Sequence, residues 1–302
     1  MITPPTISTV TYNGFTVDVL RLDLVHPEVS GNKWYKLFYN LQKISSVKES
    51  VVLTFGGLNS NHIAATAAAA QQLGIASAAV IRGKEGDSPT LMRAIEKGMH
   101  VFRLSREDYR NKSINEVRHL LSLKYTSIIE IPEGGNNAAG LVGCSEIPIP
   151  PGYDRIGVAC GTATTFGGLL RRRTTERLTG FSVLKGENRL AEDLKPIYNE
   201  LGWPFPAVGS TCNDNCAIVN TYAGAGYASF EKEVVAFSLD FYAHTGILLD
   251  QVYTSKMFYG VFDLLKKGIW SASEKIILLH TGGLQGNTAF YQRYALQMSH
   301  LQ

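Results

Sequence analysis

The chain has 302 residues, of which 45% are hydrophobic and 18% are charged, with a formal net charge of +3. This composition is typical of a soluble globular protein that is long enough for one or two domains with substantial cores. The small net charge gives no support to nucleic-acid binding, and no apolar stretch reaches the roughly 20 residues of a membrane helix.

The first notable segment is SGNKWYKLFYN, residues 30–40. Its Ser-Gly-Asn start is typical of a turn that leads into a helix. Lys33 and Lys36 then lie three residues apart among aromatic and aliphatic residues. Two interpretations are open: both lysines are solvated, with their stems over aromatic rings, or they lie in an apolar site and serve a function there.

From about residue 50 the chain alternates segments typical of buried strands with segments typical of helices. The first series predicts strands at 51–57, 76–83, 100–105 and 127–135. It predicts helices at 61–74, 89–98 and 114–124. Repeated strand–helix–strand units favour a mostly parallel sheet with helices on both faces.

A second series follows a proline-rich stretch, which suits a crossover between domains. It predicts strands at 155–161, 178–184 and 275–283, and helices after 161, at 230–246 and at 255–268. We therefore predict an α/β protein of two domains, each with an open, mostly parallel, twisted sheet flanked by helices. The expected domains are a larger one of residues 1–47 plus 152–302 and a smaller one of residues 48–151.

Ligands of such folds bind beyond the carboxyl ends of the strands, and two loops there carry suitable residues. The first is GGLNSNH, residues 56–62, in which Ser60 and Asn61 stand at the start of a predicted helix. Free N–H groups and the helix dipole at such a place favour an anion, such as a carboxylate. Simple N-capping by Ser60 or Asn61 explains the same residues.

The second loop is GTATT, residues 161–165, ahead of another predicted helix. Three hydroxyls and several free N–H groups at a helix start suit a phosphate, and capping by one threonine is the alternative. The loop lacks the Gly-Lys-Ser/Thr ending of a Walker A motif. No GxGxxG follows a strand, so a dinucleotide is not expected.

A phosphate cradle, an anion site and a lysine in an apolar helix together suggest pyridoxal 5'-phosphate (PLP) as the cofactor. A lysine forms a Schiff base with the PLP aldehyde, and apolar surroundings lower the pKa of that lysine toward reactivity. Lys33 is the candidate for this lysine. Lys36, one helical turn further on, is a candidate for the phosphate contact.

Seven motifs then occur in order along nearly the whole chain: HPEVSGNKWYKL (26–37), GGLNSNH (56–62), PEGGNN (132–137), CGTATTFGGL (160–169), YAGAGYA (222–228), LLDQVYTSKMFYG (248–260) and LLHTGG (278–283). With these motifs the chain resembles the 1-aminocyclopropane-1-carboxylate (ACC) deaminase and D-cysteine desulfhydrase family. The resemblance implies a PLP enzyme with a fold of the tryptophan-synthase β type. It also implies a small amino acid as substrate and a homodimer.

The resemblance assigns cofactor contacts to individual residues. Lys33 would hold the cofactor, and Asn61 would lie beside its ring. The phosphate contacts would come from Lys36, Gly161, Thr162, Ala163, Thr164 and Thr165.

The resemblance also assigns residues to the substrate. Ser60, Asn61 and His62 would bind its carboxylate, and Ser60 would be a candidate proton relay. Tyr227 and Tyr253 match the family's two active-site tyrosines, and the counterpart of Tyr253 is the proposed nucleophile or proton relay of ACC deaminases.

Two positions bear on which amino acid is the substrate. ACC deaminases have Glu after the second tyrosine and Leu before the closing Gly-Gly, whereas this chain has Thr254 and Thr281 at these positions. Threonine at both positions resembles the D-cysteine desulfhydrases. The motif SNH in place of SNQ resembles them as well. A carboxylate near the pyridine nitrogen favours a protonated, strongly electron-withdrawing ring, whereas a threonine hydroxyl only hydrogen-bonds to that nitrogen. A neutral ring should suffice for loss of an α-proton and expulsion of sulfide, but it should help less with opening a cyclopropane.

We therefore expect a PLP-dependent lyase that converts D-cysteine into pyruvate, sulfide and ammonia. The alternative enzyme activity is ACC deaminase, which gives 2-oxobutyrate and ammonia. The alternative that is not an enzyme is a PLP-binding protein without activity, and the presence of Lys33, Ser60 and Tyr253 argues against it.

The cysteines and the N-terminus bear on location. The cysteines are expected to be free thiols in a reducing compartment, because CNDNC (212–216) has no second Cys/His pair for zinc. The N-terminus lacks the basic start and apolar core of a signal peptide, so a cytoplasmic protein is expected. Tyr222 and His280 are expected to serve packing in the core.

Overall fold

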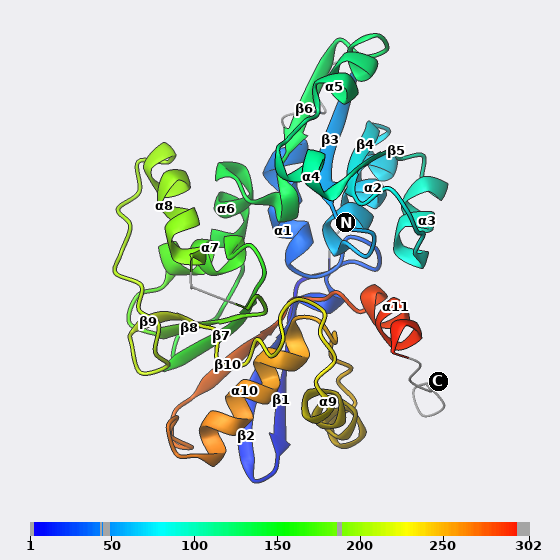
Figure 1. Ribbon diagram of the computed structural model, residues 1–302. Helices are drawn as coiled ribbons and strands as arrows, with labels where there is room; N and C mark the ends of the chain where they lie inside the picture. The colour runs from blue at the N-terminus through cyan, green and yellow to red at the C-terminus, as the bar shows by residue number, and fades with distance from the viewer. Residues whose placement is uncertain (1–2, 43, 45–48, 186–188, 295–302) are drawn as a thin grey trace.

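The computed structural model describes residues 3–42, 44, 49–185 and 189–294 of the chain. Within these residues the strands form two sheets in different parts of the molecule (Figure 1). The larger sheet has the spatial order β1 (Thr6–Tyr12), β2 (Phe15–Arg21), β10 (Ile276–His280), β7 (Arg155–Cys160), β8 (Arg177–Ser182) and β9 (Cys216–Val219). β1 and β2 are antiparallel, and all other neighbours in this sheet are parallel.

The smaller sheet is wholly parallel. Its spatial order is β5 (His100–Leu104), β4 (Ala76–Arg82), β3 (Ser50–Gly56) and β6 (Ser127–Ile131). The central strands of both sheets are nearly continuous apolar runs, as expected where both faces of a parallel sheet are covered. In β10, Ile277 and Leu279 join one hydrophobic cluster and Ile276 and Leu278 join another, because successive side chains of a strand point to opposite faces.

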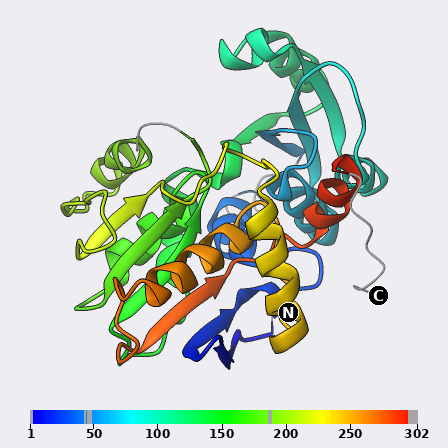
Figure 2. The same cartoon turned by 60° about the horizontal axis from the view of Figure 1, so that its bottom comes forward.

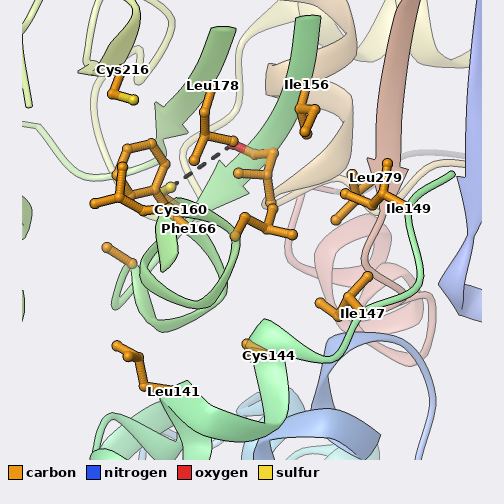
Figure 3. Close-up of a cluster of buried hydrophobic side chains, with 14 of the residues drawn as sticks. Leu141, Cys144, Ile147, Ile149, Ile156, Cys160, Phe166, Leu178, Cys216 and Leu279 are labelled. Carbon is orange, nitrogen blue, oxygen red and sulfur yellow. Dashed lines mark hydrogen bonds between the residues drawn. The ribbon is translucent and has the colours of Figure 1, made fainter. Parts of the chain in front are cut away.

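Helices cover both faces of the larger sheet. One face packs against α6 (Ala138–Ser145), α7 (Thr164–Arg172) and α8 (Leu190–Glu200). Figure 3 shows part of this cluster, in which Ile156, Leu178 and Leu279 of the strands pack with Leu141 and Phe166 of the helices. The other face packs against α9 (Lys232–Thr245) and α10 (Thr254–Lys266), which lie next to each other in Figure 2.

The smaller sheet is covered in the same way. On one face lie α2 (Asn61–Leu73) and α3 (Pro89–Glu96), and on the other lies α5 (Asn115–Ser122). The remaining short elements are α4 (Arg106–Arg110), η1 (Leu22–Leu24) and η2 (Glu133–Gly135). No helix within the described residues is both long and apolar enough to cross a bilayer.

Helix α1 (Asn32–Gln42) packs against both parts of the molecule. Leu37 and Leu41 pack with Val52 of β3, whereas Tyr35 belongs to the cluster on the larger sheet. Figure 1 shows α1 between the two sheets. The C-terminal α11 (Gln285–Arg293), which follows β10, also contacts the other part of the molecule, at α3.

The predicted fold class is confirmed, since the molecule has two parallel-rich sheets flanked by helices. α2 begins after Ser60 and ends at Gly74 in the left-handed conformation, as the sequence predicts. The strand predicted at 127–135 is too long, because β6 ends at Ile131 and Pro132 leads into a turn. Proline has no N–H to continue the ladder.

Candidate active site

Lys33 lies in the first turn of α1, against the turn that follows β10. Gly31 has a φ of +69°, and a Cβ there would lie 1.9 Å from the carbonyl oxygen of Thr281. Only glycine allows this approach and this backbone conformation. The Asn32 N–H also donates to the Thr281 oxygen, at 3.3 Å, so the start of α1 is attached to the end of the larger sheet.

Lys33 is half-buried, and its amine is held from one side. Its Nζ donates to Asn32 Oδ1 at 2.7 Å, and Asn32 Nδ2 donates to Thr165 Oγ1 at 2.8 Å. Burial, reinforced by the charge of Lys36 and opposed by that of Asp250, lowers the pKa of Lys33 to about 7. A large share of the amine is therefore neutral and nucleophilic at neutral pH.

Lys36 is buried and meets the loop after β7 through a chain of hydroxyls. Lys36 Nζ lies 3.5 Å from Thr162 Oγ1, which lies 2.9 Å from Thr164 Oγ1. Thr164 donates to Asn136 Oδ1 at 2.8 Å. Because a hydroxyl has one proton, Thr164 accepts from Thr162, and Thr162 accepts from Lys36. Ala163 is left-handed at the start of α7, whose first N–H groups have no intrahelical acceptor, so the loop offers several donors to a phosphate.

Ser60, Asn61 and His62 form the start of α2, directly after β3. Ser60 Oγ accepts from the Ile63 N–H at 3.3 Å, so the capping interpretation is confirmed for Ser60. The first intrahelical bond at this end runs from the Ala64 N–H to the Ser60 oxygen. The N–H groups of Asn61 and His62 precede it and are oriented for an anion. Capping and anion binding therefore use different atoms of this loop.

The His62 ring is buried and neutral. Thr54 Oγ1 donates to the Ile131 carbonyl at 2.9 Å and lies 2.8 Å from His62 Nε2. Since Thr54 has a single proton, His62 Nε2 carries a hydrogen and Nδ1 is an acceptor. Burial, followed by the charges of Lys33 and Lys36, lowers the pKa of His62 to about 3. The ring therefore offers a carboxylate no donor, and the backbone N–H of His62 is the group suited to that role.

Asp250, in the loop before α10, is a buried residue of this site that the sequence prediction does not include. Its Oδ1 accepts from the backbone N–H groups of Tyr253, at 2.5 Å, and Thr254, at 3.3 Å. Burial raises the pKa of Asp250 to about 7, against the opposing effects of these hydrogen bonds and of Lys33. In the sequence, Asp250 is only an acidic residue shortly before a predicted helix. Ordinary N-cap residues show the same pattern, so the sequence does not mark Asp250 as part of a site.

Three buried acceptor atoms around this centre have no hydrogen-bond partner within the described part of the chain. They are Asn61 Oδ1, His62 Nδ1 and Asp250 Oδ2. An unpaired buried polar group costs about 1–3 kcal/mol, and such groups are rare in folded proteins. A ligand with N–H or O–H donors, or ordered water, would satisfy them.

The two predicted tyrosines lie together beside the phosphate-type loop. A Cβ at Gly161 would lie 3.0 Å from Tyr253 Cε1, so the Tyr253 ring covers the start of that loop. The Tyr253 hydroxyl donates to the Tyr227 oxygen at 3.3 Å. Burial raises the pKa of Tyr227 and of Tyr253 above its ordinary value, so both hydroxyls are protonated at neutral pH.

The two threonines that bear on the substrate differ in their contacts. Thr254 is fully buried. Its hydroxyl accepts from the Asp250 N–H at 2.8 Å and donates to the Asp250 carbonyl at 3.3 Å. The Thr281 hydroxyl makes no hydrogen bond to any residue that the structure describes, so it is the freer of the two hydroxyls to meet a ligand.

The packing roles expected for His280 and Tyr222 are confirmed. His280 is fully buried and lies 2.7 Å from the Leu248 carbonyl through Nε2. The Tyr222 hydroxyl donates to Asp263 at 2.7 Å, and its ring packs on Phe181. The prediction of free thiols is confirmed as well, for Cys144, Cys160, Cys212 and Cys216.

Known proteins resemble this chain along most of its length. No family model matches it. A Pyrococcus furiosus protein, provisionally named 1-aminocyclopropane-1-carboxylate deaminase, is 31% identical over 290 residues, which cover 90% of this chain and 86% of the relative. This chain belongs to the ACC deaminase and D-cysteine desulfhydrase family.

Other relatives represent both activities of the family. The mitochondrial bifunctional D-cysteine desulfhydrase/ACC deaminase of Arabidopsis thaliana is 28% identical over 302 residues, which cover 91% of this chain and 74% of the relative. A Yersinia pestis D-cysteine desulfhydrase is 24% identical over 303 residues, which cover 93% of this chain and 90% of the relative. The predictions of the family and of an enzyme are confirmed.

Solved structures agree with the family assignment. The crystal structure of an ACC deaminase homologue has a TM-score of 0.80 and 28% identity, with 94% of this chain and 90% of that chain covered. A fungal L-serine ammonia-lyase from Rhizomucor miehei shares the fold, with a TM-score of 0.63 and 14% identity, and the match covers 97% and 99% of the two chains. The expected fold of the PLP enzymes is thereby confirmed for this family member.

Proposed function

We propose that this family member binds PLP and releases ammonia and a 2-keto acid from a small amino acid, with D-cysteine as the substrate. The observation that carries the proposal is the place of the Lys33 amine, set between a phosphate-type loop and three buried acceptors without partners among the described residues. Thr254 and Thr281 favour D-cysteine by the argument from ring protonation. ACC is the second candidate, because the Pyrococcus furiosus relative is provisionally named for that activity.

The residues present fit PLP. The Lys33 amine suits its aldehyde, and Lys36, Thr162 and the first N–H groups of α7 suit its phosphate. The Asn61 side chain, whose oxygen has no partner among the described residues, and the Thr281 hydroxyl are available to the ring. When bound, PLP holds the amino acid covalently and withdraws electrons from its α-carbon.

The remaining steps depend on residues of the chain. The N–H groups of Asn61 and His62 bind the substrate carboxylate and fix its orientation. Lys33 Nζ removes the α-proton, since an amine with a pKa near 7 is an efficient base at neutral pH. Because Tyr253 donates its proton to Tyr227, Tyr227 keeps its own proton for the departing sulfur.

The experiment that tests this function is product analysis with the PLP-loaded protein. D-cysteine, L-cysteine and ACC are supplied separately, and pyruvate, 2-oxobutyrate and sulfide are quantified. We expect equal amounts of pyruvate and sulfide from D-cysteine and little 2-oxobutyrate from ACC. If 2-oxobutyrate from ACC dominates, the second candidate is correct, and PLP binding without any keto acid would leave a non-catalytic binding protein.

The role of the threonines gives a separate prediction. In the double variant Thr254→Glu with Thr281→Leu, we expect the ratio of ACC turnover to D-cysteine turnover to rise about tenfold, which corresponds to ~1.4 kcal/mol in the activation barrier. The reason is that a carboxylate favours a protonated ring. Thr281→Leu alone is the control, because it removes a hydroxyl without adding charge. An unchanged ratio in the double variant would contradict the argument.

Three further expectations from the sequence are part of this proposal. They are a homodimer, a cytoplasmic location supported by the free thiols, and a division of the chain into two domains. The larger domain has residues 1–47 plus 152–302, and the smaller has residues 48–151.

A further inference from the structure

The carboxyl group of Asp250 has one occupied and one unoccupied oxygen. Oδ1 accepts the N–H groups of Tyr253 and Thr254 and thereby caps the start of α10. Oδ2 is buried and has no partner within the described residues. The capping bonds explain why an acidic residue stands here, but they leave the second oxygen unexplained.

The Asn61 side chain and the Asp250 carboxyl both lie close to Gly283 and Gly286, where the chain turns from β10 into α11. A Cβ at Gly283 would lie 2.7 Å from Asn61 Nδ2 and 3.1 Å from Asp250 Oδ2. A Cβ at Gly286 would lie 3.6 Å from Asn61 Oδ1 and 3.8 Å from Asp250 Oδ2. The amide and the carboxyl therefore meet across this glycine turn, and each presents an unpaired buried oxygen there.

Two acceptor oxygens cannot pair with each other, but one proton resolves the conflict. If Asp250 is protonated on Oδ2, that hydroxyl donates to Asn61 Oδ1, directly or through one water, and both oxygens are satisfied. If Asp250 is ionised, Nδ2 of Asn61, which lies close to Gly283 beside the carboxyl, is the atom that has to face the carboxylate. The two orientations leave opposite hydrogen-bonding groups of Asn61 for the rest of the site.

We propose that Asp250 is a positioning residue whose proton sets the orientation of the Asn61 amide. The protonated form leaves the Asn61 NH₂ group, a donor, facing the candidate cofactor site. The ionised form leaves the Asn61 oxygen, an acceptor, facing it. The link to catalysis rests on the proposed function, whereas the coupling between Asp250 and Asn61 belongs to the folded chain and does not depend on a cofactor.

The charges around Asp250 are compatible with a proton that is gained and lost near neutral pH. Burial raises the pKa of Asp250 to about 7, and Lys33 and the capping N–H groups limit that rise. The titratable groups that face it from the surrounding elements are Lys33 of α1, Lys256 of α10, Tyr291 of α11, and Tyr227 and Tyr253 from the loops.

The test uses the full-length chain without cofactor, labelled with ¹⁵N on asparagine, and follows the Asn61 side-chain NH₂ signals against pH. The signals are assigned by their loss in Asn61→Ala. The variant Asp250→Asn keeps an acceptor oxygen for the cap of α10 but cannot ionise. Asp263→Asn, on α10 itself and paired with Tyr222 and Lys267, is the matched control for removing a carboxylate.

In the wild type we expect the Asn61 signals to shift with a midpoint near the Asp250 pKa of about 7, and we expect the same shift in Asp263→Asn. In Asp250→Asn the shift should be lost, with the signals fixed near their low-pH positions. The same shift in Asp250→Asn, or no shift in the wild type, would overturn the proposal. Failure of PLP binding would overturn the proposed function instead and leave this measurement unaffected.

A second readout covers the case in which the amide signals are broadened. The pKa of Asp250, raised above its ordinary value by burial, means that the folded state binds this proton more tightly than the unfolded state. Asp250 therefore contributes stability below its ordinary pKa of 3.8 that is lost as the pH rises through about 7. The difference in unfolding free energy between wild type and Asp250→Asn should fall between about pH 4 and about pH 7 and level off above that, and a pH-independent difference would overturn the proposal.

Discussion

Replacing Lys33 by alanine is expected to lower keto-acid release by at least about 10³-fold, because one amine serves as both the covalent anchor of the cofactor and the base for the α-proton. The variant is also expected to lose the absorbance band of lysine-bound PLP. Both readouts are needed, since loss of activity alone would follow from any damage to the fold.

The control for Lys33→Ala is an exposed lysine. Lys195 pairs with Glu192 on the surface of α8, so Lys195→Ala should retain wild-type activity and the full cofactor spectrum. An unchanged lysine-bound PLP spectrum in Lys33→Ala would show that another amine holds the cofactor, and Lys36 would then be the next candidate.

Replacing Gly31 by alanine is expected to lower the free energy of unfolding by about 3 kcal/mol, in two parts. A left-handed conformation costs an alanine about 1–2 kcal/mol, and overpacking adds about 1–3 kcal/mol. The overlap is with the backbone at Thr281, which cannot turn aside as a side chain can. Chemical denaturation of the cofactor-free variant measures the loss.

Gly14→Ala is the matched control for this prediction. Gly14 also has a positive φ, of +80°, but a Cβ there would have no atom within 4 Å. This variant should lose only the conformational part, about 1 kcal/mol. Equal losses in the two variants would show that the contact between Gly31 and Thr281 is not tight.

The order of strands and helices could be predicted because its signals are local. α2 is an example, since its cap at Ser60 and its stop at Gly74 both lie within the helix's own sequence. The hairpin of β1 and β2 also has a local signal, the pair Asn13-Gly14, but alternation of strands and helices does not reveal it. The sequence pattern does not predict α6 or α8. Glycines in α6 and Pro196 in α8 oppose a helix by propensity, and packing on the larger sheet outweighs that preference.

The candidate site was predictable as a set of loops, not as a set of contacts. Lys33, Ser60 and Thr162 could be proposed because each stands near the start of a helix that follows a turn. The bond between Asn32 and Thr165 joins residues 133 positions apart, and no local pattern indicates it. The neutral state of His62 depends on which way Thr54 donates, and the burial of Asp250 depends on the turn around Gly283.

Helix α1 has its first turn fixed to the larger sheet at Thr281 and its later turns packed on the smaller sheet through Leu37 and Leu41. An α-helix is stiff over this length, so the Lys33 amine stands at a junction whose position both halves of the molecule determine. During evolution, a substitution in the core of either half would therefore be selected partly by its effect on the position of the Lys33 amine. Changes in the packing of Leu41, two turns away, would then be selected by reaction rate as well as by stability.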